Sequence, residues 1–179
     1  SGLTSIAIPA RVTEMGSGAF SGCSRLTSIT IPEDVTAIGY RTFYGCSSLT
    51  SITIPIKVKE IGDGAFSGCS NLESIIVDEN NKTYYSGEDC NAIIEKSSKK
   101  LILGCKNTKI PSGVTEIGED AFYGCSGLTS ITIPDSVTKI TVDVWSGGAF
   151  SGCSNLESII VDKNNETYDS RGDCNAIIE

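Results

Sequence analysis

Residues 43–66 read FYGCSSLTSITIPIKVKEIGDGAF, and this stretch decides the fold. The phenylalanine that opens it returns 23 residues later, at Phe66, with nearly every apolar neighbour in the same place. The five phenylalanines of the chain all occupy this position: Phe20, Phe43, Phe66, Phe122 and Phe150. Self-similarity at such a period indicates a solenoid, in which each repeat forms one coil and packs on its neighbours.

One half of the repeat has the pattern of a strand. In LTSITIP, which begins at Leu49, the side chains of Leu49, Ile52 and Ile54 alternate with small polar residues, and proline ends the run. A period of two predicts a strand with one buried face, so we expect Ser51 and Thr53 to point outward. Stacked coils would align these strands about 4.8 Å apart in a parallel sheet on the concave face.

The other half of the repeat changes to intervals of three and four. Val58, Ile61, Ala65, Phe66 and Cys69 follow this spacing, which predicts short helical or 3-10 turns on the convex face. We also expect the phenylalanines to stack as one continuous spine. The fold predicted is therefore an α/β solenoid with a 23-residue period. A parallel β-helix is the structural alternative, but it would not need the GAFxGC segment.

The period is interrupted once in the middle of the chain. Val77 and Ile110 are 33 residues apart where 23 are expected, which defines an insert at 78–108. Within it, the run from Cys90 to Cys105 has two apolar segments around a lysine-rich turn, a pattern that predicts a β-hairpin.

An outward isoleucine precedes the insert. Ile76 stands where Thr53 stands in the regular repeat, and we expect the apolar side of the hairpin to cover it. A truncated second copy of the insert occupies 162–179, with Ile160 in the corresponding place. We expect one solenoid over 1–179. Because its first six residues, SGLTSI, recur in mid-repeat at 126–131, we expect it to be a fragment of a longer array.

Composition excludes several classes of function. The formal net charge is −8, which argues against nucleic acid or an anionic membrane as partner. There is no histidine, the commonest general base and metal ligand, and no apolar run of the length that spans a bilayer. No base is placed beside the repeated serines, so we predict no enzymatic activity, no metal and no cofactor.

The cysteines also follow the repeat. Five of the eight hold one fixed inward position, Cys23, Cys46, Cys69, Cys125 and Cys153. We expect them to be reduced and buried, packed as small hydrophobic side chains. Cys90 and Cys105 flank the predicted hairpin, and either a disulfide or two free thiols would fit this spacing. Asn81 and Asn165 match the N-glycosylation sequon.

A second irregularity lies between Ile140 and Phe150. The extra residues TVDVW carry the only tryptophan, Trp145. Trp145 is a candidate contact residue, since tryptophan is enriched at interfaces. The alternative is that its ring folds back over the coil.

The repeat unit resembles that of the BspA-like leucine-rich repeats, LxxIxIPxxVxxIGxxAFxxCxx. The matching positions in one repeat are Leu26, Ile29, Ile31, Pro32, Val35, Ile38, Gly39, Phe43 and Cys46. Thr42 replaces the usual alanine. The resemblance implies a leucine-rich repeat protein at a bacterial cell surface or outside the cell, with a role in adhesion and without a catalytic motif.

The resemblance and the outward residues together favour a protein-binding module. Its expected contact surface is the concave strand face, carried by Ser28, Thr30, Ser51, Thr53, Ser130 and Thr132. A host matrix or cell-surface protein is the partner expected. The alternatives are a passive structural spacer, since such ladders lack aromatic and arginine anchors, and a carbohydrate-binding module.

Overall fold

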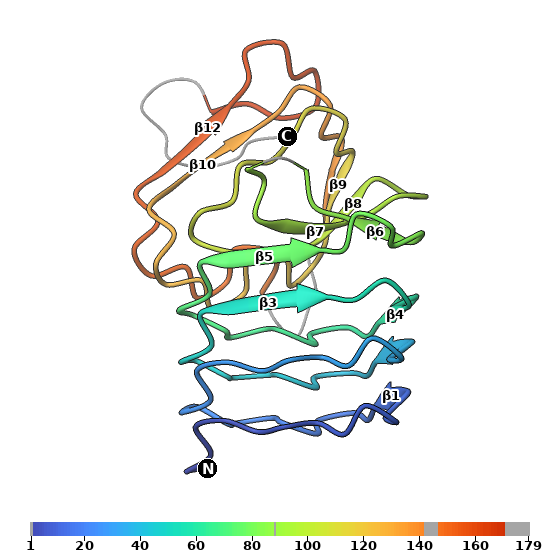
Figure 1. The fold of residues 1–179 in the computed structure, drawn as a ribbon. Helices are drawn as coiled ribbons and strands as arrows, with labels where there is room; N and C mark the ends of the chain where they lie inside the picture. Colours follow the sequence, from blue (N-terminus) through green and yellow to red (C-terminus); the bar gives the residue numbers. More distant parts are fainter. Residues whose placement is uncertain (1, 88, 142–146, 171–179) are drawn as a thin grey trace.

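The computed structural model describes residues 2–87, 89–141 and 147–170, which form a stack of coils (Figure 1). The described residues contain short β-strands joined by turns and no helix, so no helix able to cross a bilayer is found among them. The N-terminus lies at the bottom of the stack in this view, and the coils follow one another upward.

Parallel strands form one side of the stack, as predicted. β3 (Ser51–Ile54) pairs with β5 (Ser74–Val77), and β10 (Ser130–Ile133) pairs with β12 (Ser158–Val161). Every second side chain is inward, so that Ile52 and Ile54 are 1% and 0% exposed while the residues between them face solvent. The solvent side of these strands is called the strand face below.

A second set of short strands runs beside the first. β1 (Glu14–Met15), β2 (Ala37–Ile38) and β4 (Glu60–Ile61) pair in parallel, as do β9 (Glu116–Ile117) and β11 (Lys139–Ile140). A glycine follows Ile38, Ile61 and Ile117, and it permits the coils to approach closely here. A Cβ on Gly62 would lie 2.5 Å from the backbone nitrogen of Tyr40.

The prediction of helical or 3-10 turns is wrong for the described residues. The segments that run from this glycine to the following cysteine, here called turn segments, are successive β-turns. The N–H of Tyr44 donates within its own coil, to the carbonyl of Arg41 at 3.2 Å, but the N–H of Phe43 donates to Ala65 of the next coil at 2.7 Å. Because alternate N–H groups bond between coils, the backbone cannot close the internal hydrogen bonds of a helix.

The predicted hairpin is present. β7 (Ala92–Glu95) pairs antiparallel with β8 (Lys100–Gly104), and β6 (Tyr84–Tyr85) pairs antiparallel with the other edge of β7. β8 then pairs in parallel with β9, so the hairpin joins a five-stranded sheet in the order β11-β9-β8-β7-β6.

The hairpin lies between the two halves of the stack and does not cover Ile76. Ile93 and Leu103 pack into the core of the coils before it, whereas Ile94 and Leu101 pack into the core of the coils after it. In Figure 1, β7 lies between β5 and β10, and β10 and β12 run obliquely to β3 and β5. Ile76 remains 53% exposed, so the expected cover is absent.

The phenylalanines form two stacks, not one continuous spine. Rings are stacked between Phe20 and Phe43 at 5.5 Å, between Phe43 and Phe66 at 5.2 Å, and between Phe122 and Phe150 at 5.2 Å. Among the described residues, no ring contact joins Phe66 to Phe122. The hairpin accounts for the break.

Gly104 of β8 packs against the ring of Phe122. A Cβ at this position would lie 2.2 Å from the ring, so only glycine fits there without a shift. The backbone of the hairpin therefore contacts the ring of Phe122, in the part of the stack where the row of stacked phenylalanines is interrupted.

Asn81 connects the start of the insert to the preceding coil. Its side chain is fully buried, and Nδ2 donates to the carbonyls of Pro55 and Val58 at 2.7 and 3.0 Å. Asn165 makes the corresponding bonds to Pro134 and Val137. Both N–H groups of each amide are used, so neither sequon offers a free acceptor nitrogen in the folded chain. Residues 171–179 of the predicted second copy lie outside the described residues.

Candidate interaction surfaces

The strand face carries four of the six contact residues predicted from the sequence, and Ser28 and Thr30 lie in the preceding coil, in a segment that forms no strand. The side chains of Ser28, Thr30, Ser51, Thr53, Ser130 and Thr132 are exposed. The hairpin separates Ser130 and Thr132 from the other four. The structure therefore brings these residues together as two patches, one on each side of the insert.

Each patch includes an exposed isoleucine. In the strand pairs, Thr53 lies opposite Ile76 and Thr132 lies opposite Ile160. These isoleucines are 53% and 52% exposed. They add an apolar contact to a surface of small polar groups, at equivalent places in both halves. The change from SITIP to SIIVD is the sequence signal for them.

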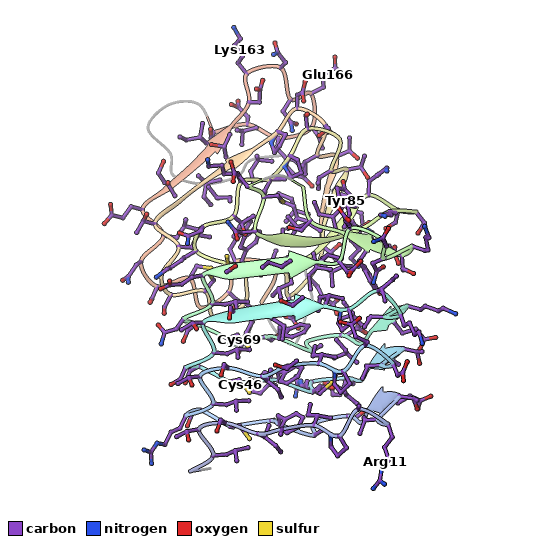
Figure 2. All side chains as sticks on the ribbon, viewed as in Figure 1. Arg11, Cys46, Cys69, Tyr85, Lys163 and Glu166 are labelled. Atoms are coloured by element: carbon purple, nitrogen blue, oxygen red, sulfur yellow. The ribbon has the colours of Figure 1, made fainter. Side chains whose placement is uncertain are left out.

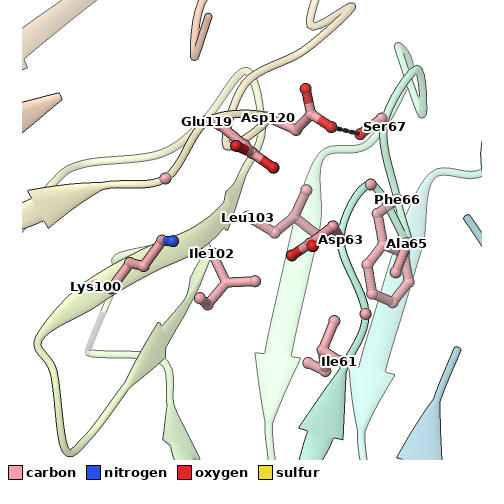
Figure 3. Close-up of a pocket in the computed structure, with 13 residues that line it drawn as sticks. Ile61, Asp63, Ala65, Phe66, Ser67, Lys100, Ile102, Leu103, Glu119 and Asp120 are labelled. Carbon is pink, nitrogen blue, oxygen red and sulfur yellow. Dashed lines mark hydrogen bonds between the residues drawn. The ribbon is translucent and has the colours of Figure 1, made fainter. Parts of the chain in front are cut away.

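A small cavity lies where the two halves meet. It measures about 60 Å³ and is lined by the turn segment after β4, by β8 and by residues 118–120 (Figure 3). Ser67 donates a hydrogen bond to Asp120 Oδ2 at 3.2 Å, and Asp120 Oδ1 is buried without a partner. The volume is far below the roughly 300 to 1,000 Å³ of a typical small-molecule pocket, so the cavity does not resemble a substrate site.

Glu116 is the centre of a small ionic network beside this cavity. Lys100 and Lys139 lie 3.3 and 3.2 Å from its carboxylate, and the hydroxyl of Thr141 donates to it at 3.0 Å. Burial would raise the pKa of Glu116, but the hydrogen bonds from Lys139, Thr141 and Lys100 outweigh it and lower the pKa. A carboxylate held in its charged form by two lysines joins neighbouring coils and is a poor proton acceptor.

The repeated cysteines form a row of free thiols through the core. Cys46 Sγ donates to the carbonyl of Phe20 at 3.2 Å, and Cys69 Sγ to that of Phe43 at 3.4 Å. Figure 2 shows Cys46 and Cys69 in successive coils. Cys23, Cys46, Cys69 and Cys125 are buried, and Cys153 is partly buried.

Burial favours the protonated thiol of Cys46 and of Cys153. Desolvation, with a smaller effect of the neighbouring Cys23, raises the pKa of Cys46 to about 11, and burial raises the pKa of Cys153 to about 11. Burial also raises the pKa values of Cys90 and Cys105, which are free and buried. These thiols lack the lowered pKa of a nucleophilic cysteine.

The free energy of unfolding should therefore fall at alkaline pH. In the unfolded chain Cys46 ionises at its ordinary value of 9.0, but in the folded chain it ionises near 11. The folded state holds the proton of Cys46 more tightly than the unfolded chain does. The contribution of this thiol to the free energy of unfolding is therefore fully present below pH 9 and is lost as the pH rises towards 11. Urea titrations at about pH 8 and about pH 10.5 should show a lower midpoint at the higher pH. Cys46→Ala should reduce this difference, and equal midpoints for the unmodified chain would contradict the buried row.

Trp145 lies in 142–146, outside the described residues. Within the described ranges, no group of three or more acidic, cysteine or histidine side chains could hold a metal ion.

Comparison with known proteins identifies the repeat. The model of the BspA type leucine rich repeat region matches the chain in 6 copies, over residues 1–95 and 93–171. No curated protein matches the chain.

Solved structures show the same kind of fold. A leucine rich cell surface protein from Faecalibacterium prausnitzii is 28% identical, with a TM-score of 0.51, over 89% of this chain and 60% of that one. A leucine-rich repeat protein from Eubacterium ventriosum is 26% identical, with a TM-score of 0.60, over 89% of this chain and 54% of that one. The pneumococcal vaccine antigen PcpA is 22% identical, with a TM-score of 0.73, over 91% of this chain and 40% of that one. The chain thus spans about 40 to 60% of the length of these proteins.

Proposed function

The chain belongs to the BspA-type leucine-rich repeat family, and from this premise we propose that it is a non-enzymatic protein-binding segment of a bacterial surface protein. Proteins of this repeat type typically bind other proteins. The expected location is extracellular or on the cell surface, and the expected partner is a host matrix or cell-surface protein.

The observation that carries the proposal is the composition of the strand face. Ser51, Thr53, Ser130 and Thr132 are outward on paired strands, so their hydroxyls form an exposed, regular array. Ile76 and Ile160 lie beside them and expose apolar area to solvent. Burying this area against a partner would favour binding. Many small polar contacts around an apolar point suit a broad protein surface more than a deep ligand pocket.

A double substitution on β3 tests this surface. Ser51→Lys with Thr53→Lys should weaken binding to an array of host matrix proteins by about tenfold or more, because two charges would be buried unpaired at the contact. The fold should persist, since both side chains face solvent. Ser112→Lys, at an exposed position outside these strands, is the matched control.

Three outcomes separate the candidate functions. Unchanged binding of the β3 variant would exclude the patch on β3 as the contact, and unchanged binding after the same change at Ser130 and Thr132 would exclude the strand face. Binding confined to a glycan array would favour a carbohydrate-binding module. Blank protein and glycan arrays would leave the passive spacer.

A further inference from the structure

One coil departs from the repeat at a strained position on its turn segment. Gly18 and Gly64 have φ values of 64° and 62°, in the left-handed region that suits glycine. The equivalent residue in the coil between them is Arg41, with a φ of 50°. A long side chain rarely adopts this conformation, and such outliers concentrate at functional sites.

The neighbours of Arg41 change with it. Tyr40 and Tyr44 stand where the preceding coil has Ser17 and Ser21. The turn segment therefore exchanges three small residues for two tyrosines and an arginine. Tyr40 is 49% exposed, and Arg41 is exposed.

The substituted side chains pack against one another. Arg41 Cζ lies 5.0 Å from the ring centroid of Tyr40 and 4.9 Å from that of Tyr44, so both tyrosines contact one guanidinium. Cation–π contacts of this kind hold the planar guanidinium while its N–H groups stay available. Among the described residues, Arg41 has no ion pair.

A third tyrosine reaches the same surface from beyond the insert. The rings of Tyr44 and Tyr123 lie 6.4 Å apart, and a hydrogen bond to Tyr44 raises the pKa of Tyr123. Gly45 donates to the carbonyl of Ser67, and Gly68 to that of Tyr123, so the coil of Ser67 lies between the two rings. The small side chain of Ser67 lets the rings of Tyr44 and Tyr123 approach each other.

We propose that Tyr40, Arg41, Tyr44 and Tyr123, here called the tyrosine–arginine cluster, bind a protein segment that presents an aspartate or glutamate carboxylate beside an apolar residue. An arginine fork matches a carboxylate in two parallel hydrogen bonds, and the tyrosine rings offer apolar area next to it. Tyrosine and arginine are the residue types that dominate binding energy in protein interfaces. In a chain of net charge −8, an unpaired guanidinium is the feature that an acidic segment can recognise.

The inference about the tyrosine–arginine cluster rests on the proposed binding function, but it concerns a different surface. It lies on the turn segments, away from Ser51 and Thr53 on the strand face. The two surfaces can therefore fail separately: substitutions in β3 and β10 test the strand face, and substitutions in the cluster test this inference.

The repeat itself supplies a variant that should fold. Tyr40→Ser, Arg41→Gly and Tyr44→Ser together give this turn segment the residues of the preceding coil at every position except Thr42, where the preceding coil has Ala19. The change returns glycine to a left-handed position, so the urea midpoint should be retained or raised. Arg25→Ser is the matched control, because it removes the same charge at an exposed position where the next coil has Ser48.

The probes are two arrays of short peptides, one with a central glutamate between apolar residues and one with glutamine in its place. The unmodified chain and Arg25→Ser should bind glutamate peptides, and the triple variant should bind them about tenfold or more weakly. Equal binding to both arrays, retained binding by the triple variant, or no binding to any peptide would each overturn the proposal. Cluster-dependent binding to carboxylated glycans without binding to peptides would overturn it too.

Discussion

Phe43→Ala is expected to lower the free energy of unfolding by about 3 to 5 kcal/mol. The ring is fully buried and is stacked on both sides, by Phe20 at 5.5 Å and by Phe66 at 5.2 Å. Truncation would leave a cavity that neighbouring coils cannot fill, because their backbones are fixed by hydrogen bonds between coils. Urea titration followed by circular dichroism would measure the loss.

Phe20→Ala provides the internal comparison. Phe20 is only partly buried and has one stacked neighbour among the described residues, so its loss should be smaller. If both substitutions had the same effect, or if Phe43→Ala changed the midpoint little, the stacked rings would not stabilise the coils as argued.

Asn81→Ala is the second large effect, with an expected loss of about 2 to 5 kcal/mol. The fully buried amide donates to Pro55 and Val58, and its Oδ1 accepts the N–H groups of Thr83 and Tyr84 at 2.9 and 2.8 Å. Its removal would take these bonds from the carbonyl of Val58 and from the N–H groups of Thr83 and Tyr84 where water has little access, and each such loss is costly. The carbonyl of Pro55 would still accept the N–H of Val58 at 3.3 Å. Thermal and urea unfolding would both report the change.

Two asparagine variants sharpen this test. Asn80→Ala should change stability little, because Asn80 is exposed and contributes only its backbone N–H to Asp78. Asn165→Ala removes the same four kinds of bond at a partly exposed site, so it should have an intermediate effect. Equal stability of the Asn80 and Asn81 variants would rule out the bridging role.

The turn segments show why apolar spacing misled the prediction of a helix. Intervals of three and four report which side chains are buried, as with Ala65, Phe66 and Cys69. They do not report where backbone N–H groups donate. Here alternate groups donate to the next coil, which a single repeat read alone cannot reveal.

The hairpin was predictable as a hairpin, but the prediction that it covers Ile76 is wrong. Its first strand contains Ala92, Ile93 and Ile94 in succession, and all three are 0% exposed. A continuous apolar run is typical of a strand buried on both faces, so the signal was present in the residues. A hairpin that only covered Ile76 would have needed one apolar face, with polar residues on the other.

The sequence by itself determined the coil. Alternation in LTSITIP and the recurrence of phenylalanine and cysteine specify which side chains point inward, because each repeat must bury the same set against its neighbours. Only the tertiary structure decided how the coils on either side of the insert meet. The contact of Tyr44 with Tyr123, the approach of Gly104 to Phe122 and the two separate phenylalanine stacks all depend on the depth of the hairpin between the halves. Periodicity describes packing between equivalent residues and carries no information about contacts that form where the period is broken.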